Sequence, residues 1–226
     1  MSHKGKFIVI EGGDGTGKST QVEIITNELH KRGIETLEVY NDDTNQMEPI
    51  REPGGVPIAN ELRKVILNRH LERDPWTNVM LFTANRRVNW LQAIKPALDS
   101  GKWVVCSRSW ISTLVYQGYG EGIDIKRITD YVEQNIGIEY MNPDVLLILQ
   151  VDNHLVREGR IGNRIKPKNP DTFESMPREF QDKLLNGFTR YSTDSNTPMV
   201  DASKSIHSVS KDIWRYIEPL IVKESK

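Results

Sequence analysis

A glycine-rich segment near the N-terminus carries the clearest chemical signal in the sequence. Residues 12–19 are Gly-Gly-Asp-Gly-Thr-Gly-Lys-Ser, which fits the pattern Gly-x-x-x-x-Gly-Lys-Ser/Thr. Glycines let the backbone curl until successive N–H groups point inward, and the start of a following helix adds positive potential, so such a loop attracts phosphate. Lys18 is placed to bridge the outer phosphates of a nucleotide, and Ser19 to ligate Mg²⁺. The residues expected to bind the nucleotide are Gly12, Gly13, Asp14, Gly15, Thr16, Gly17, Lys18, Ser19 and Thr20.

The elements beside this loop have the order that phosphate binding requires. An apolar run at 7–10 predicts a strand before the loop, and 17–31 predicts a helix after it that stops at Gly33. This context disfavours a chance match to the pattern. The loop leaves the phosphate acceptor open, because GTPases, ATPases and small-molecule kinases share it.

Short apolar runs alternate with helical patterns along the whole chain. This alternation predicts an α/β fold of the P-loop NTPase type, a parallel sheet with helices on both faces, in a single domain over 1–226. Asp74 followed by Pro75 predicts the start of a long helix that runs to about Leu98. The polar segment 41–55 is expected to be an exposed loop. The five expected strands are 7–10, 36–40, 103–107, 144–151 and 198–202.

Composition limits the partners of the protein. The 226 residues include 30 Lys and Arg and 31 Asp and Glu, and the formal charge of −1 disfavours nucleic-acid binding. The apolar run at 7–10 is shorter than the core of a signal peptide, about 7–15 residues, and no run approaches the roughly 20 needed to span a bilayer. Cys106 is the single cysteine, so no disulfide can form within the chain. The chain is therefore expected to be soluble and cytoplasmic, without a membrane partner.

Downstream of the loop, several segments in order resemble those of the thymidylate kinase family. This resemblance covers most of the chain and is far more specific than the loop alone. The segments are Arg51-Glu52-Pro53-Gly54-Gly55, Phe82-Thr83-Ala84-Asn85-Arg86, Ile94 to Leu98, Ser107-Arg108-Ser109 and Ser112 to Gly118.

The resemblance implies that ATP is the donor, Mg²⁺ the cofactor and thymidine monophosphate (dTMP) the acceptor. In the family, Phe82 would stack on the pyrimidine, Arg86 would bond the same nucleotide, and Tyr116 would disfavour a ribose 2′-hydroxyl. Phe82 on its own would more often be a core residue, but a helix face that turns from apolar Val79 to Arg86 indicates a bound anion. The residues implied to bind the acceptor are Asp14, Arg51, Pro53, Phe82, Arg86, Arg108, Thr113, Tyr116 and Gln117.

A flexible lid at about 157–174 is expected to supply catalytic charge. One subgroup of the family carries an arginine within the phosphate loop, where this chain has Gly15, and the other uses lid arginines, which this chain resembles. A solvated basic loop is the alternative. The expected catalytic residues are Lys18, Arg108, Arg157, Arg160 and Arg164.

Two acids of the family pattern are replaced in this chain. Ser107 stands where the Asp-Arg-x motif begins with an acid, and Gln150 replaces another at a strand end, so Mg²⁺ would rely on Ser19, phosphates and water, with Glu11 or Asp14 nearby. Two alternatives therefore stay open: a kinase of another or modified pyrimidine deoxynucleotide, and a nucleotide-binding module without catalysis. The resemblance also implies a homodimer.

Overall fold

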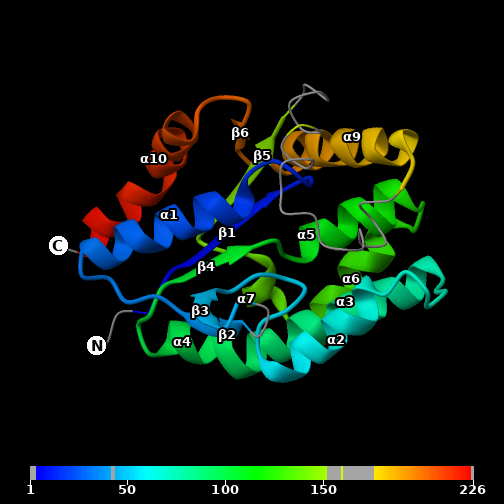
Figure 1. Ribbon diagram of the computed structural model, residues 1–226, viewed down its shortest axis with the longest axis horizontal. Coiled ribbons are helices and arrows are strands. Elements are labelled where there is room, and N and C mark those ends of the chain that lie inside the picture. The colour runs from blue at the N-terminus through cyan, green and yellow to red at the C-terminus, as the bar shows by residue number, and fades with distance from the viewer. Residues whose placement is uncertain (1–3, 42–43, 152–158, 160–175, 225–226) are drawn as a thin grey trace.

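A four-stranded parallel sheet forms the centre of the protein, in the order β4-β1-β5-β6 (Figure 1). The strands are β1 Phe7–Gly12, β4 Val104–Ser107, β5 Val145–Gln150 and β6 Met199–Asp201. The computed structural model describes residues 4–41, 44–151, 159 and 176–224. Every neighbouring pair in this sheet is parallel, which confirms the predicted α/β class.

Side chains of the strands alternate between two separate cores. In β1, Phe7 and Val9 belong to one core, and Ile8 and Ile10 belong to the other. Successive side chains of a strand point to opposite faces, so a strand that is apolar at every position must be covered on both sides. Helices therefore lie on both faces of the sheet (Figure 1).

The two helical layers differ in size. Helices α1 (Lys18–Lys31) and α10 (Ile206–Glu224) cover one face, and the remaining helices pack on or beside the other. Those remaining elements are α2 Pro57–Leu67, α3 Pro75–Asn89, the π-helix η1 Trp90–Ile94, α4 Lys95–Asp99, α5 Trp110–Thr113, the π-helix η2 Leu114–Gly120, α6 Ile125–Asn135, α7 Ile138–Met141 and α9 Arg178–Ser195.

The fifth predicted strand, 36–40, is not a strand of this sheet. Thr36 makes an isolated parallel bridge to Trp103, and the chain then leaves the sheet edge to form an antiparallel hairpin of β2 (Glu38–Asn41) and β3 (Gln46–Pro49). The chain then returns to the sheet edge, where Arg51 makes an isolated parallel bridge to Ser107, the last residue of β4. The hairpin thus interrupts what would be a continuous edge strand, and it also corrects the prediction of a plain loop over 41–55.

Local signals at the helix ends are confirmed. The Asp74 carboxylate accepts hydrogen bonds from the N–H groups of Trp76 and Thr77, at 2.9 and 3.1 Å, so it caps α3. Helix α3 continues through η1 and α4 to Asp99, in agreement with the predicted end near Leu98. None of the described helices is long and apolar enough to cross a membrane.

Candidate active site

The phosphate loop joins the end of β1 to the start of α1. Gly12 has a φ of 137°, and a Cβ there would lie 2.2 Å from the Leu149 carbonyl oxygen of β5, so only glycine fits beside that strand. Gly17 caps α1 with a φ of 88°. The Lys18 ammonium lies over the loop and donates to the Gly13 carbonyl at 2.6 Å. The loop and its lysine therefore have the arrangement expected of a phosphate-binding turn.

Glu11, a fully buried acid, connects this loop to the segment that follows β4. Its Oε1 accepts from the Ser109 N–H at 2.6 Å and the Ser112 N–H at 3.1 Å, and its Oε2 accepts from the Ser112 hydroxyl at 2.8 Å. The Ser109 hydroxyl and the Gly12 N–H complete the set. A buried carboxylate needs such donors to offset its lost hydration. Glu11 thereby ties the backbone that follows Arg108 to the end of β1.

Arg108 sits between the phosphate loop and the π-helix η2. Its backbone is left-handed, with a φ of 73°, a conformation that costs roughly 1–2 kcal/mol in a residue with a Cβ. Its guanidinium bonds the Asp14 carboxylate, lies 3.1 Å from Ser112 Oγ, and approaches the Tyr116 hydroxyl at 3.4 Å. Tyr116 in turn donates to Asp14 at 3.1 Å. Burial raises the pKa of Tyr116, so the phenol stays neutral and keeps its donor.

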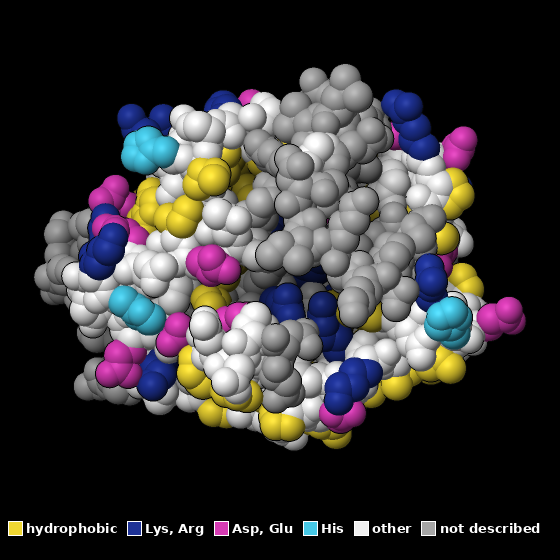
Figure 2. Space-filling view, in the orientation of Figure 1, with side chains coloured by type: hydrophobic (Ala, Val, Ile, Leu, Met, Phe, Trp, Pro, Cys, Tyr) yellow, Lys and Arg dark blue, Asp and Glu magenta, His cyan; other side chains and the backbone are white. Residues whose placement is uncertain are grey.

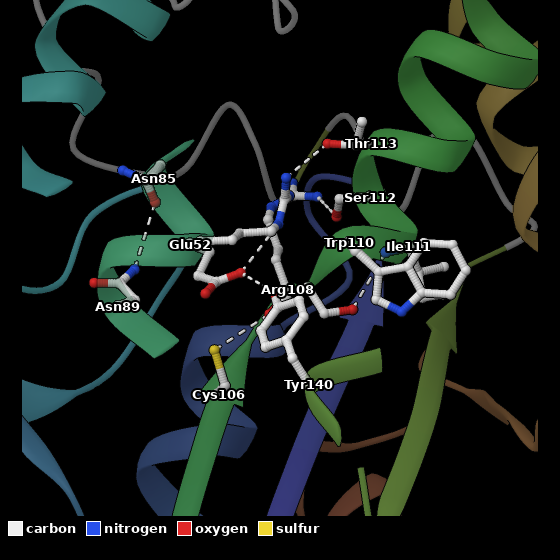
Figure 3. A network of polar contacts seen from close by, with 12 residues as sticks. Glu52, Asn85, Asn89, Cys106, Arg108, Trp110, Ile111, Ser112, Thr113 and Tyr140 are labelled. Carbon is white, nitrogen blue, oxygen red and sulfur yellow. Dashed lines mark hydrogen bonds and ion pairs between the residues drawn. The ribbon is translucent and has the colours of Figure 1, made fainter. Parts of the chain in front are cut away.

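Arg86 belongs to a second buried cluster, next to the first. Its Nε lies 3.1 Å from Glu52 Oε2, and its Nη1 donates to Thr113 Oγ1 at 2.7 Å. Tyr140 donates to the same Glu52 oxygen at 2.6 Å (Figure 3). Burial raises the pKa of Glu52, while Arg86 and Tyr140 oppose that rise. The Phe82 ring lies 5.3 Å below the guanidinium, in cation–π range.

Side chains of both clusters line one pocket, whose empty volume of about 420 Å³ includes space open to solvent. Dark-blue basic side chains lie in a hollow near the centre of the face shown in Figure 2. Eight of the nine predicted acceptor residues line this pocket, together with Leu67 and Ser112. The eight are Asp14, Pro53, Phe82, Arg86, Arg108, Thr113, Tyr116 and Gln117.

Arg51, the ninth, lines a neighbouring cleft instead. That cleft lies between the β2–β3 hairpin and α2, and its walls include Tyr40, Asn60 and Arg63. Arg51 also makes an isolated parallel bridge with Ser107. Its side chain is thus placed next to the pocket rather than in its wall.

Two buried asparagines of α3 hold the turn that follows Arg51. Asn89 donates to the Gly54 carbonyl at 2.6 Å and accepts from the Val56 N–H at 3.1 Å. Asn85 accepts from the Gly54 N–H at 3.3 Å, and its Oδ1 also accepts from Asn89 Nδ2 at 3.4 Å (Figure 3). A Cβ on Gly55 would lie 2.2 Å from Asn89 Oδ1, so the turn and the helix fit only with glycine there. The helix that carries Phe82 and Arg86 therefore also fixes the loop opposite them.

The ligands that the site offers to Mg²⁺ are Ser19 and the nearby acids Glu11 and Asp14. Ser19 is exposed at the start of α1 and offers a hard oxygen ligand, which Mg²⁺ prefers. The Glu11 carboxylate is filled by protein donors, and Asp14 is held by Arg108 and Tyr116. Within the described part of the chain, no group of three or more His, Cys, Asp or Glu could hold a metal. The residues fit an ion bound mainly by phosphates and water, with Ser19 as its protein ligand.

Several site residues were not predicted. Glu52, Tyr140 and Ser109 shape the pocket from behind through bonds that join segments far apart in the sequence. Glu52 falls within the Arg51-to-Gly55 segment, so its motif was the available signal, whereas Tyr140 carries no local signal. The predicted lid arginines Arg157, Arg160 and Arg164 lie outside the described residues.

Comparisons with known proteins identify the relatives of this chain. The sequence model of the family described as "Thymidylate kinase" matches residues 10–213. The thymidylate kinase of Prochlorococcus marinus (strain NATL2A) is 34% identical over 220 residues, 96% of this chain and 98% of that protein. That of Chlamydia felis (strain Fe/C-56) is 36% identical over 185 residues, 80% of this chain and 81% of that protein. A crystal structure of thymidylate kinase from Ehrlichia chaffeensis shares the fold, with a TM-score of 0.71 at 24% identity, over 95% of this chain and 99% of that one. The chain belongs to the thymidylate kinase family.

Proposed function

We propose that this family member transfers the terminal phosphoryl group of ATP to dTMP, giving ADP and dTDP. One observation carries the proposal: Asp14 is part of the phosphate loop, yet its carboxylate bonds Arg108 and Tyr116 of the pocket. The donor loop and the acceptor pocket therefore share a wall. Two nucleotides bound on either side of Asp14 would bring their phosphates together, which is what phosphoryl transfer requires.

The chain's own cations would stabilise the transferred group. Lys18 would contact the outer phosphates of ATP, and Arg108 would contact the acceptor phosphate with its charged fork. Mg²⁺, held by Ser19 and the phosphates, would neutralise charge on the phosphate oxygens. Arg108 is pre-placed by Glu11 and Asp14, so little reorganisation would be needed.

The base of the acceptor would lie over Phe82. Tyr116 would lie beneath the sugar, and Arg86 would donate to the pyrimidine edge. The lid arginines Arg157, Arg160 and Arg164 remain part of the proposal on the strength of their sequence spacing. They would add positive charge as the phosphoryl group moves.

Purified protein assayed with ATP and a panel of deoxynucleoside monophosphates tests the function. We expect turnover with dTMP and a preference for it over the purine monophosphates. Lys18→Ala should lower kcat by about a hundredfold or more, whereas Lys31→Ala, an exposed lysine of the same helix, should leave it unchanged. Binding of both nucleotides without any diphosphate product would identify a non-catalytic module instead.

We further infer a homodimer that works in the cytoplasm. Large apolar side chains are exposed along α2, the α2–α3 connection, α3 and η1, which supports an interface on this side. They are Ile58, Val65, Leu71, Met80 and Leu91. Sedimentation should show a dimer, and the pair Met80→Glu and Leu91→Glu should convert it to a monomer. A monomeric unmodified protein would contradict the inference.

A further inference from the structure

Gln117 presents its side-chain amide to the pocket in one defined orientation. The residue is fully buried, lines the pocket and donates from Nε2 to Glu121 Oε2 at 3.0 Å. An ionised carboxylate can only accept hydrogen bonds, so the amide nitrogen must face Glu121. The amide oxygen Oε1 then has no hydrogen-bond partner among the described residues.

Glu121 is itself held in place. It follows the last residue of η2, and its N–H donates to the Tyr116 carbonyl at 3.0 Å. Its side chain is half-buried, and the hydrogen bond from Gln117 opposes the rise in its pKa that burial causes. The glutamate thus reaches Gln117 from the backbone of the helix end rather than from a flexible loop.

Arg86 offers the complementary group in the same pocket. Glu52 engages its Nε and Thr113 its Nη1, while Nη2 is buried without a hydrogen-bond partner among the described residues. A guanidinium can only donate. The pocket wall therefore carries one unsatisfied acceptor, on Gln117, and one unsatisfied donor, on Arg86.

We propose that Glu121 is a positioning residue that locks the Gln117 amide with its oxygen toward the base, so that the pocket selects pyrimidines with an N–H next to a carbonyl. Thymine and uracil carry that pair at N3 and C4. Cytosine carries the reverse, an acceptor at N3 and an amino group at C4, and would face acceptor with acceptor and donor with donor. Leaving a buried polar group unpaired is unfavourable, so each mismatch weakens binding substantially. This inference rests on the proposed function and names how its base selectivity arises.

The ratio of kcat/KM for dTMP to that for dCMP tests the proposal in the full-length protein. Glu121→Leu removes the acceptor and lets the Gln117 amide turn, so we expect this ratio to fall about tenfold, since 1.4 kcal/mol is a factor of ten. Arg86 still opposes cytosine, so selectivity should not vanish. The ratio of dTMP to dUMP should stay unchanged, because these two differ only in the methyl group.

Matched variants separate positioning from general structural damage. Glu121→Gln can still accept from Gln117 but can also donate to it, so the dTMP to dCMP ratio should fall less than in Glu121→Leu. In a Gln117→Leu background, Glu121→Leu should cause no further change in that ratio. Glu133→Leu, an exposed glutamate of α6, should leave it at the wild-type value.

Three results would overturn the proposal. They are an unchanged dTMP to dCMP ratio in a folded Glu121→Leu protein, an equal loss with all three substrates, and, should Glu121→Leu not fold, an unchanged ratio in Glu121→Gln. Absence of dTMP turnover in the unmodified protein would instead contradict the proposed function, so the two failures are distinguishable.

Discussion

Tyr140→Phe isolates one buried hydrogen bond behind the acceptor pocket. The phenol donates to Glu52 Oε2 at 2.6 Å, and the change removes only that hydroxyl. The ring contacts with Phe7 and Trp90, at centroid distances of 6.0 and 5.7 Å, should persist because phenylalanine keeps the ring. Glu52 would then keep the Arg86 ion pair and a weaker interaction with the Asn89 amide, and its Oε1 has no hydrogen-bond partner by distance and angle among the described residues.

The size of the effect follows from this environment. A hydrogen bond to a charged group contributes about 1.5–3 kcal/mol, and full burial of both Tyr140 and Glu52 places this one in the upper part of that range. We therefore expect the free energy of unfolding to fall by about 2–3 kcal/mol. For a chain of this length, 1 kcal/mol corresponds to about 2–4 °C, so Tm should fall by about 4–12 °C. If half of the loss falls on the placement of Arg86, kcat/KM for dTMP should fall by about tenfold.

Urea denaturation and steady-state kinetics measure the two effects. KM for dTMP should rise, while KM for ATP should stay constant, because Glu52 contacts Arg86 of the acceptor pocket and not the phosphate loop. Tyr216→Phe, at an exposed tyrosine of α10, is the matched control and should change neither. A loss of unfolding free energy below about 0.5 kcal/mol, or equal increases in both KM values, would refute this account of the cluster.

Two further predictions concern the turn and the helix that frame the pocket. Gly55→Ala should lower the free energy of unfolding by about 2–4 kcal/mol, because the residue has a φ of 124° and its Cβ would lie 2.2 Å from Asn89 Oδ1. Gly33→Ala is the control: its φ is also positive but no atom lies near the new Cβ, so it should cost only roughly 1–2 kcal/mol. Equal losses for the two variants in urea denaturation would contradict the clash. The side-chain and backbone hydrogen bonds of Thr77 lower the pKa of Asp74, so this cap stabilises the protein above the ordinary pKa of 3.8 and loses its effect as pH falls through the lower folded-state pKa. Asp74→Asn keeps a capping oxygen but does not titrate. The free energy of unfolding of the unmodified protein should therefore fall relative to that of Asp74→Asn only in this acidic window. A difference between the two proteins that stays constant down to about pH 2 would exclude the linkage.

The elements that could be predicted from the sequence are those with local signals. The phosphate loop, the cap at Asp74 and the apolar strands each depend on residues close together in the chain. The loop, the cap and four of the five predicted strands occur where they were expected. The hairpin was missed because β3 has the sequence Gln-Met-Glu-Pro, which lacks strand-forming residues and pairs only through its partner β2.

The residues that line the acceptor pocket were predicted from the family segments, but the buried acids that hold them in place were not predicted. Glu52 lies in a polar segment that was expected to be exposed, yet the fold buries it against Tyr140, 88 positions away. Glu11 follows the apolar run within β1, and nothing near it in sequence indicates that five donors surround it. Such partners are set by strand order and helix packing, which local patterns do not encode.

The pairing of each pocket arginine with an acid explains how a chain of net charge −1 can bind two anionic nucleotides. Arg86 is matched by Glu52 and Arg108 by Asp14, so neither cation is buried uncompensated. Each acid engages only part of its guanidinium. Arg86 Nη2 has no hydrogen-bond partner among the described residues and can donate to a ligand, whereas Arg108 Nη1 lies within hydrogen-bond distance of Ser112 Oγ. The acids thus fix the direction of each donor while cancelling its long-range charge. Selectivity for a nucleotide monophosphate then depends on the local orientation of these donors rather than on the overall field of the protein.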